Sequence, residues 1–296
     1  MLKSAVSLPL RILAAVLTSG TLATASAQSA PPAPAPPADP RAASPLPATP
    51  DPNADFLAKA SQLYYSSAKA GLRGFDCQIH PDWRTTILSE HTDQTAVATS
   101  PEVQLLKSVT ITLHGRLSGG STVDWNPPPP SATPLNPQSE DLLDHMHQGV
   151  ERSLTGFMQF WAPFVDGSVI PATSQGIEIT HSETVHTIHA DQEGVSLTEI
   201  LGKDLVIQQF NVVTGDAKIN FSPRYKSTAQ GLLASGFNAN MQGPSEAAGQ
   251  AQHMQVEVEY QTVSGFPIPA RIVMEVAGGE KFDFALEECV ANPPAS

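Results

Sequence analysis

The C-terminal half of the chain alternates apolar and polar residues with a period of two. The stretch "VEVEYQTVSGFPIPARIVMEV", from Val256 to Val276, shows it most clearly, with two alternating runs around a turn rich in Gly and Pro. Such alternation predicts antiparallel strands with one apolar and one solvated face. The residues expected on the apolar face are Val256, Val258, Tyr260, Thr262, Ile268, Ala270, Ile272, Met274 and Val276.

The same period runs from Gly176 to the closing "KFDFALEECV" segment, which predicts a long antiparallel meander. The segments are "GIEITHSETVHTIHA", "VSLTEILG", "DLVIQQFNVV", "AKINFSPRY" and "GLLASGFNAN", followed by a "QGPSEAAGQAQ" loop and the hairpin above. Two further strands, "FDCQIH" and "SVTITLHGRL", are expected earlier in the chain.

Helical spacing occurs in two places. "PNADFLAKASQLYYSSAKAGLRG" predicts a helix that ends at Gly71 and Gly74. "SEDLLDHMHQGVERSLTGFMQFWAPF", which follows a break at four consecutive prolines, predicts a longer helix capped by Ser139 and ended by Pro163. Its apolar stripe consists of Leu143, Met146, Val150, Leu154, Phe157 and Trp161.

This order of elements predicts an α+β fold in residues 54–292, which we interpret as one domain. We expect a strongly curved antiparallel sheet, in effect an unclosed β-barrel, with helices covering its concave face. The apolar stripe and the apolar strand faces then line a concavity, which is either hollow or filled by packed side chains.

The first 53 residues differ in character from the rest. Residues 1–27 have Lys3 and Arg11 around an apolar run that ends in Ala25-Ser26-Ala27, the pattern of a secretory signal peptide; an uncleaved membrane anchor is the alternative. Residues 28–53 are dense in Pro and Ala and predict an extended tether.

The charge balance argues against one class of partner, and the cysteine content predicts a disulfide. Without the two basic residues of the signal peptide, 14 basic residues stand against 29 acidic ones, so the mature chain is strongly acidic. Such a balance repels phosphate backbones and argues against nucleic acid as a partner. In an oxidising compartment, Cys77 and Cys289 are expected to form a disulfide between the first and last strands, with buried free thiols as the alternative.

The order of elements and one hairpin resemble a known family. A helix leading into a first strand, "GLLASGF", the Tyr260 hairpin with its Gly-x-Pro-x-Pro turn, and "FDFALEE" are similar to the periplasmic lipoprotein carriers, the LolA-like and LppX-like proteins. The resemblance implies an unclosed barrel with a helical lid, whose hollow receives acyl chains. Arg84 and Arg116 are the candidates for that family's lid-binding arginine.

From this resemblance we expect a periplasmic, monomeric carrier of lipid or of a lipidated protein, with an envelope transporter or receptor as a further partner. The function is expected to be non-catalytic, without cofactor or metal. The expected ligand-binding residues are Leu143, Met146, Val150, Leu154, Phe157, Trp161, Val256, Val258, Tyr260, Ile272 and Met274. The alternatives are an envelope structural protein with a solid core and a metal-assisted hydrolase.

The hydrolase alternative depends on histidines. "THSETVHTIH" holds His181, Glu183, His186 and His189, but on one straight strand His186 takes the face opposite His181, and His189 lies about 27 Å from His181. One metal ion could gather them only if the strand turned midway. Asp141 and His145 have helical i, i+4 spacing, which makes at most two ligands. No HExxH, GxSxG or phosphate-binding glycine motif occurs in the sequence.

Overall fold

The computed structural model describes residue 51 and residues 53–87, 101–127, 137–167, 169–192, 194–215, 217–242, 252–276 and 280–292. The expected signal peptide, nearly all of the expected tether, most of the four-proline break and most of the "QGPSEAAGQAQ" loop lie outside these residues.

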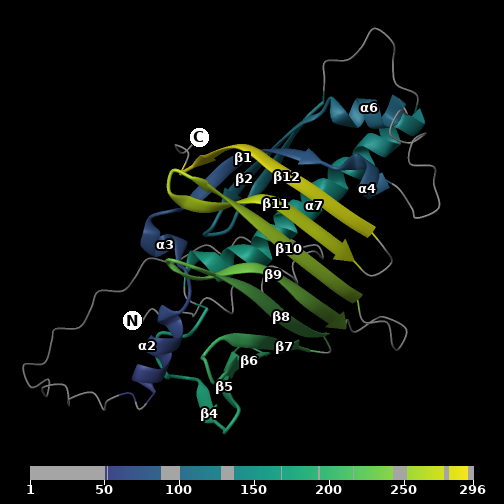
Figure 1. Ribbon diagram of the computed structural model, residues 1–296. Coiled ribbons are helices and arrows are strands. Elements are labelled where there is room, and N and C mark those ends of the chain that lie inside the picture. The colour runs from purple at the N-terminus through teal and green to yellow at the C-terminus, as the bar shows by residue number, and fades with distance from the viewer. Residues whose placement is uncertain are drawn as a thin grey trace, which may run out of the picture.

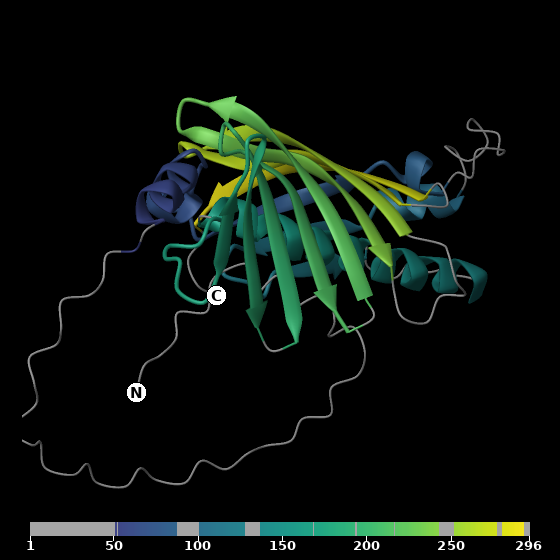
Figure 2. The ribbon, with the colours of Figure 1, turned by 90° about the horizontal axis from the view of Figure 1, so that it is seen from below.

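Twelve strands form one antiparallel sheet that does not close on itself (Figures 1 and 2). Along the sheet the order is β3-β2-β1-β12-β11-β10-β9-β8-β7-β6-β5-β4, so β1 and β12, the first and last strands in the sequence, pair as the third and fourth strands from one edge. The strands are β1 (Gly74–Pro81), β2 (Thr110–Arg116), β3 (Thr122–Asn126), β4 (Glu178–His181), β5 (Val185–Gln192), β6 (Val195–Gly202), β7 (Ile207–Thr214), β8 (Ala217–Thr228), β9 (Gly231–Gln242), β10 (Gln252–Val263), β11 (Phe266–Val276) and β12 (Glu280–Ala291).

Five helices lie in the described part of the chain. They are α2 (Ala54–Gln62), α3 (Ser67–Ala70), α4 (Trp83–Ile87), α6 (Pro101–Lys107) and α7 (Pro137–Asp166). Only α7 runs across the sheet, from β2 and β3 to β9. We call the side of the sheet that it contacts the α7 face. The four short helices lie at the ends and margins of the sheet (Figure 1).

The expected fold class, α+β with helices covering a concave face, is therefore wrong. The described chain is predominantly one antiparallel sheet, and a single helix crosses it where a layer of helices was expected. The error has a physical cause: helical periodicity shows where a helix forms and which stripe is apolar, but not which surface that stripe packs against. Strand alternation is likewise the same in an open sheet and in a lidded barrel.

Both expected helices have different bounds in the structure. The first is split into α2 and α3, because the backbone of Leu63 and Tyr65 hydrogen-bonds to Leu232 in β9, and Tyr64 forms a parallel bridge there. The second continues past Pro163 to Asp166, and Ser139 lies inside it. Proline lacks only its own N–H donor, so the helix can extend by part of a turn beyond it.

The hairpin of β10 and β11 follows the alternation for most of its length. Val256 and Val258 face Met274 and Ile272 in register, and all four side chains are buried. A β-bulge at Tyr260 then shifts the register, so Tyr260 pairs with Pro269. The unbroken face expected from the sequence therefore ends at this bulge, where one strand holds an extra residue.

The expected disulfide is confirmed. Cys77 in β1 and Cys289 in β12 are bonded, across a sequence separation of 212 residues. The bond joins the two strands whose pairing brings the first and last strands of the described chain together inside the sheet. No helix among the described residues is both long and apolar enough to cross a bilayer.

Candidate ligand-binding site

The expected ligand-binding residues gather at the contact between α7 and the sheet. On α7, Leu143 is partly buried, and the other five expected side chains are buried: Met146, Val150, Leu154, Phe157 and Trp161. On the sheet, Tyr260 is partly buried, and Val256, Val258, Ile272 and Met274 are buried. In this state α7 therefore covers the apolar surface that the sequence assigned to a ligand.

Phenylalanines dominate the contact at the C-terminal end of α7. The ring of Phe221, in β8, lies 5.1 Å from the ring of Phe164 in α7 and 4.5 Å from that of Phe237 in β9. Offset and edge contacts of this kind add to the gain from burial. We call the five rings that meet at Phe221 the phenylalanine cluster; they are Phe160, Phe164, Phe210, Phe221 and Phe237.

A chain of hydrogen bonds ties α7 to the sheet where β9 and β10 part. The two strands pair only as far as Gly236 and Glu257. Beyond that point the hydroxyl of Tyr260 donates to the carbonyl of Ala234 and accepts a hydrogen bond of 2.7 Å from the indole N–H of Trp161. Burial raises the pKa of Tyr260 above its usual value, so the hydroxyl keeps its proton and remains a donor.

Residues near the C-terminal end of α7 make further hydrogen bonds. The hydroxyls of Ser66 and Ser67 donate to the carbonyls of Asp166 and Val165. These two carbonyls belong to the last turn of α7, whose acceptors have no partner within the helix. The segment that contains α3 thus fixes the end of α7.

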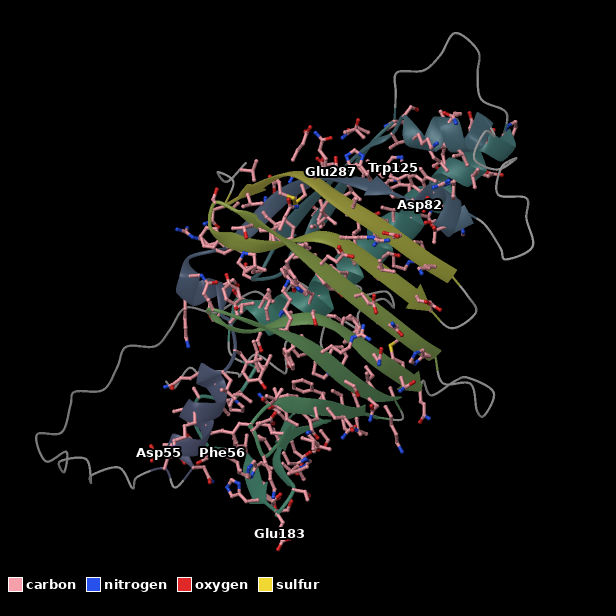
Figure 3. The ribbon with its side chains drawn as sticks, viewed as in Figure 1. Asp55, Phe56, Asp82, Trp125, Glu183 and Glu287 are labelled. Atoms are coloured by element: carbon pink, nitrogen blue, oxygen red, sulfur yellow. A yellow bond between two sulfur atoms is a disulfide. The ribbon has the colours of Figure 1, made fainter. Side chains whose placement is uncertain are left out.

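The N-terminal half of α7 contacts β2, β3 and α6. The ring of His147 stacks on that of Trp125 in β3 at 5.0 Å, and Trp125 meets Trp83 of α4 edge to face at 6.2 Å. Trp125 is labelled in Figure 3, beside the sheet edge that faces α4 and α6. The helix is thus held at two places, one on each side of the central strands.

The histidine segment turns where a straight strand was expected. β4 and β5 form a hairpin in which His181 pairs with His186, and their Nδ1 atoms lie 2.9 Å apart. Both rings contact Phe56 of α2, while Glu183 lies at the exposed tip (Figure 3). His189 instead contacts Thr198 and Asp191. The expectation that His181 and His186 take opposite faces is therefore wrong.

Two histidines come together, but the described residues contain no group of three or more side chains suited to hold a metal ion. Burial lowers the pKa of His186, and the neighbouring His181 lowers it further. The ring of His186 is thus favoured in its neutral form, in which one ring nitrogen donates and the other accepts.

The arginines proposed for a lid contact have other partners. Arg116 donates to Asp76 across β1 and β2 at 2.8 Å, and Arg84 lies 3.6 Å from Asp82 within α4 and its approach. Both pairs are at least partly exposed to solvent. His145, from the expected Asp141 and His145 pair, is exposed on α7.

A hollow of about 230 Å³ lies at the end of β7, β8 and β9, away from α7. Asparagines of three neighbouring strands contribute to it, in register with one another. Its lining consists of Asn211, Val212, Val213, Lys218, Ile219, Asn220, Asn240 and Gln242. Because none of the expected ligand-binding residues lines it, this hollow is not the expected cavity.

Sequence reasoning missed an acidic residue on the α7 face. Glu199 in β6 is 1 % exposed, and neither of its carboxyl oxygens has a hydrogen-bond partner. The signal was present in "VSLTEILG", where Glu199 takes an apolar position between Leu197 and Leu201. Tyr64 and Tyr65, read as helix residues, were missed as well, because only the tertiary structure brings them beside β9.

Comparison with known proteins identifies no relative: no family model, no curated protein and no solved structure matches this chain.

Proposed function

We propose that this protein is an exported, non-catalytic carrier that binds the acyl chains of a lipid or of a lipidated protein on the α7 face, in exchange for α7. The observation that supports the proposal is the chemistry of the contact. One helix covers a large apolar surface, and its side chains in contact with the sheet are aromatic, aliphatic or Met.

Solvation supplies the driving force. An acyl chain in water costs roughly 0.8 kcal/mol for each exposed methylene group. An apolar sheet surface offers such a chain the same environment that it offers the stripe of α7. Exchange between the two therefore conserves buried apolar area, and the free-energy difference between the closed and loaded states stays small.

The location of the hydrogen bonds indicates how α7 leaves. Trp161 and the last turn of α7 make the hydrogen bonds described above. Met146 and Val150, and over β7 and β8 the ring of Phe164, contact their surroundings through apolar atoms. Apolar contacts are not directional, so an acyl chain can replace them piece by piece. Met146 and Met158 adapt their shape readily to such a change.

The test is mass spectrometry of lipids extracted from the mature protein purified from a periplasm. We compare the wild type with Trp161→Asp, which puts a charge on the α7 face, and with Gln159→Asp, the same charge on the exposed side of α7. A carrier yields near-stoichiometric acyl species in the wild type and in Gln159→Asp, but not in Trp161→Asp.

A second measurement does not depend on the folding of a variant. Tryptophan emission should transfer to 1-dodecylpyrene added to the wild-type protein, because the probe takes the place of the stripe that contains Trp161. An empty extract together with no energy transfer from folded protein rejects the carrier. That result favours the rival, an envelope structural protein with a solid core. A buried α7 stripe is what such a core would contain.

A further inference from the structure

A single carboxyl group interrupts an apolar row on the α7 face. In register across six strands, from β4 to β9, the row consists of Ile179, Ile188, Glu199, Phe210, Phe221 and Ala239. Burying a carboxyl group without a hydrogen bond costs several kcal/mol, because the group loses its contacts with water. Glu199 has no such bond and yet is almost completely buried.

Glu199 is accompanied by tyrosines. The rings of Tyr64 and Tyr225 lie 5.2 Å apart, and both interact electrostatically with Glu199. Tyr64 has its own partners, since its hydroxyl accepts from the N–H of Ile207 at 2.7 Å and lies 3.4 Å from the carbonyl of Leu205. The hydroxyl of Tyr225 is buried and has no partner. We call Glu199, Tyr64 and Tyr225 the acid–tyrosine cluster.

Protonation decides what this cluster can bind. Burial raises the pKa of Glu199 to about 8, and no basic side chain in the described part of the chain contributes to the shift. At neutral pH the carboxyl group is therefore mostly protonated and has an O–H to donate. The unpartnered Tyr225 hydroxyl can donate as well, because burial, with Tyr64 and Glu199 nearby, keeps its pKa well above the usual value.

Two donors without acceptors fit an oxygen with two lone pairs. The carbonyl of an ester or amide is such an acceptor, and it is uncharged, so its burial requires no counterion. A cationic head would need an ionised Glu199, whereas an anionic head would be repelled whenever Glu199 lost its proton.

The acid–tyrosine cluster lies where one end of a bound acyl chain is expected. Phe210, the neighbour of Glu199 in the row, contacts Phe164 of α7 with ring centres 5.4 Å apart. Glu199 therefore lies just beyond the part of the row that α7 covers. A chain that took the place of α7 along the row would have its carbonyl end beside Glu199.

We propose that Glu199 and Tyr225 form a binding site for the ester or amide carbonyl of an acyl chain held on the α7 face. This inference rests on the proposed carrier function and names the class of ligand: acyl esters and amides, as in glycerolipids and lipidated proteins.

The experiment compares two fluorescent probes with similar tails. Methyl 1-pyrenedecanoate has an ester carbonyl, and 1-dodecylpyrene has none; the affinity of each is measured by titration. The wild type should bind the ester about tenfold more tightly at pH 7, the ratio that roughly 1.4 kcal/mol of hydrogen bonding produces.

Three variants test the role of each donor. Glu199→Leu restores an apolar row, leaves only the Tyr225 donor and should lower the preference for the ester the most. Glu199→Gln keeps a donor in nearly the same place and should retain the preference for the ester. Tyr225→Phe should lower the preference by a smaller factor, since the carboxyl group, the stronger donor, remains.

The pH profile separates donation from a purely structural role. The ester preference of the wild type should fall as the pH rises through about 8, because an ionised carboxylate cannot donate. In Glu199→Gln the preference should not change with pH. The nearby titratable groups in the described structure are Tyr64 and Tyr225, with Asp204 beside Tyr64.

The outcomes distinguish the two proposals. If no variant binds either probe, the carrier function is wrong and the carbonyl site falls with it. If the wild type and Glu199→Leu bind both probes equally, the carrier stands and the carbonyl site is wrong. Tighter binding of 1-pyrenedodecylamine than of the ester would also overturn the carbonyl site, in favour of an ionised Glu199.

Discussion

Two neighbouring clusters on the α7 face show opposite ways of filling it. In the phenylalanine cluster each ring meets other rings, and α7 closes the surface. In the acid–tyrosine cluster next to it, three polar atoms are buried without a partner among the described residues. The first cluster stabilises the closed state, whereas the second makes that state less stable than an apolar core would. The contrast indicates that the second region is shaped by something besides folding.

The largest expected effect concerns the phenylalanine cluster. Phe221→Ala should lower the free energy of unfolding by about 4 kcal/mol, because it removes the ring on which four others pack and leaves a cavity. Phe282→Ala, at a partly buried ring on β12, is the control and should cost less than half as much. Urea unfolding measures both. Equal losses would show that Phe221 contributes no more to stability than Phe282, a partly buried ring outside the cluster.

Glu199→Gln should change how the free energy of unfolding depends on pH. In the unfolded chain Glu199 loses its proton near its usual pKa, but in the folded protein it does so at about 8. Between these two values the unfolded state binds fewer protons, so wild-type stability should fall as the pH rises, by up to about 4 kcal/mol. The glutamine variant lacks this group and should show a flatter profile.

Unfolding free energies at pH 5, 7 and 9 test this prediction, with Glu183→Gln, at the exposed tip of the hairpin of β4 and β5, as a control for the loss of one negative charge. Parallel profiles for the wild type and Glu199→Gln would mean that Glu199 is ionised in the folded protein. The contrast between the two clusters would then no longer hold.

A smaller effect is expected where α7 is tied to the sheet. Trp161→Phe and Tyr260→Phe should each lower the free energy of unfolding by about 1–2 kcal/mol, because each removes one side of the hydrogen bond between them. The double variant should lose less than the sum of the two, since both single variants break the same bond. Strict additivity in urea unfolding would show that this bond does not hold α7.

The smallest effect concerns the histidine pair at α2. Since the pKa of His186 is lowered in the folded protein, the unfolded state binds more protons below about pH 6.5, so acid should weaken the contact with Phe56. Hydrogen exchange of α2 should therefore speed up between pH 7 and pH 5 in the wild type, and less so in His186→Phe. A pH-independent rate, after correction for intrinsic exchange, would contradict this prediction.

Much of the secondary structure could be predicted from the sequence. Alternation located the strands because a half-buried strand must place every second side chain in the core, and helical spacing located α7 for the corresponding reason. The turn between His181 and His186 was missed, since "HSET" contains neither Gly nor Pro. The cysteine count predicted which residues form the disulfide, because two cysteines allow one pairing.

The tertiary structure alone decided which of these surfaces meet. Contacts between residues far apart in the chain decide that α7 lies on the sheet and that Trp161 hydrogen-bonds to Tyr260. Such contacts also end the first helix before Tyr64, which pairs with β9. Glu199 illustrates the division. The sequence put it in an apolar position of a strand, but only the fold could bury it and leave it without a partner, because burial is a property of the whole assembly of strands and helix.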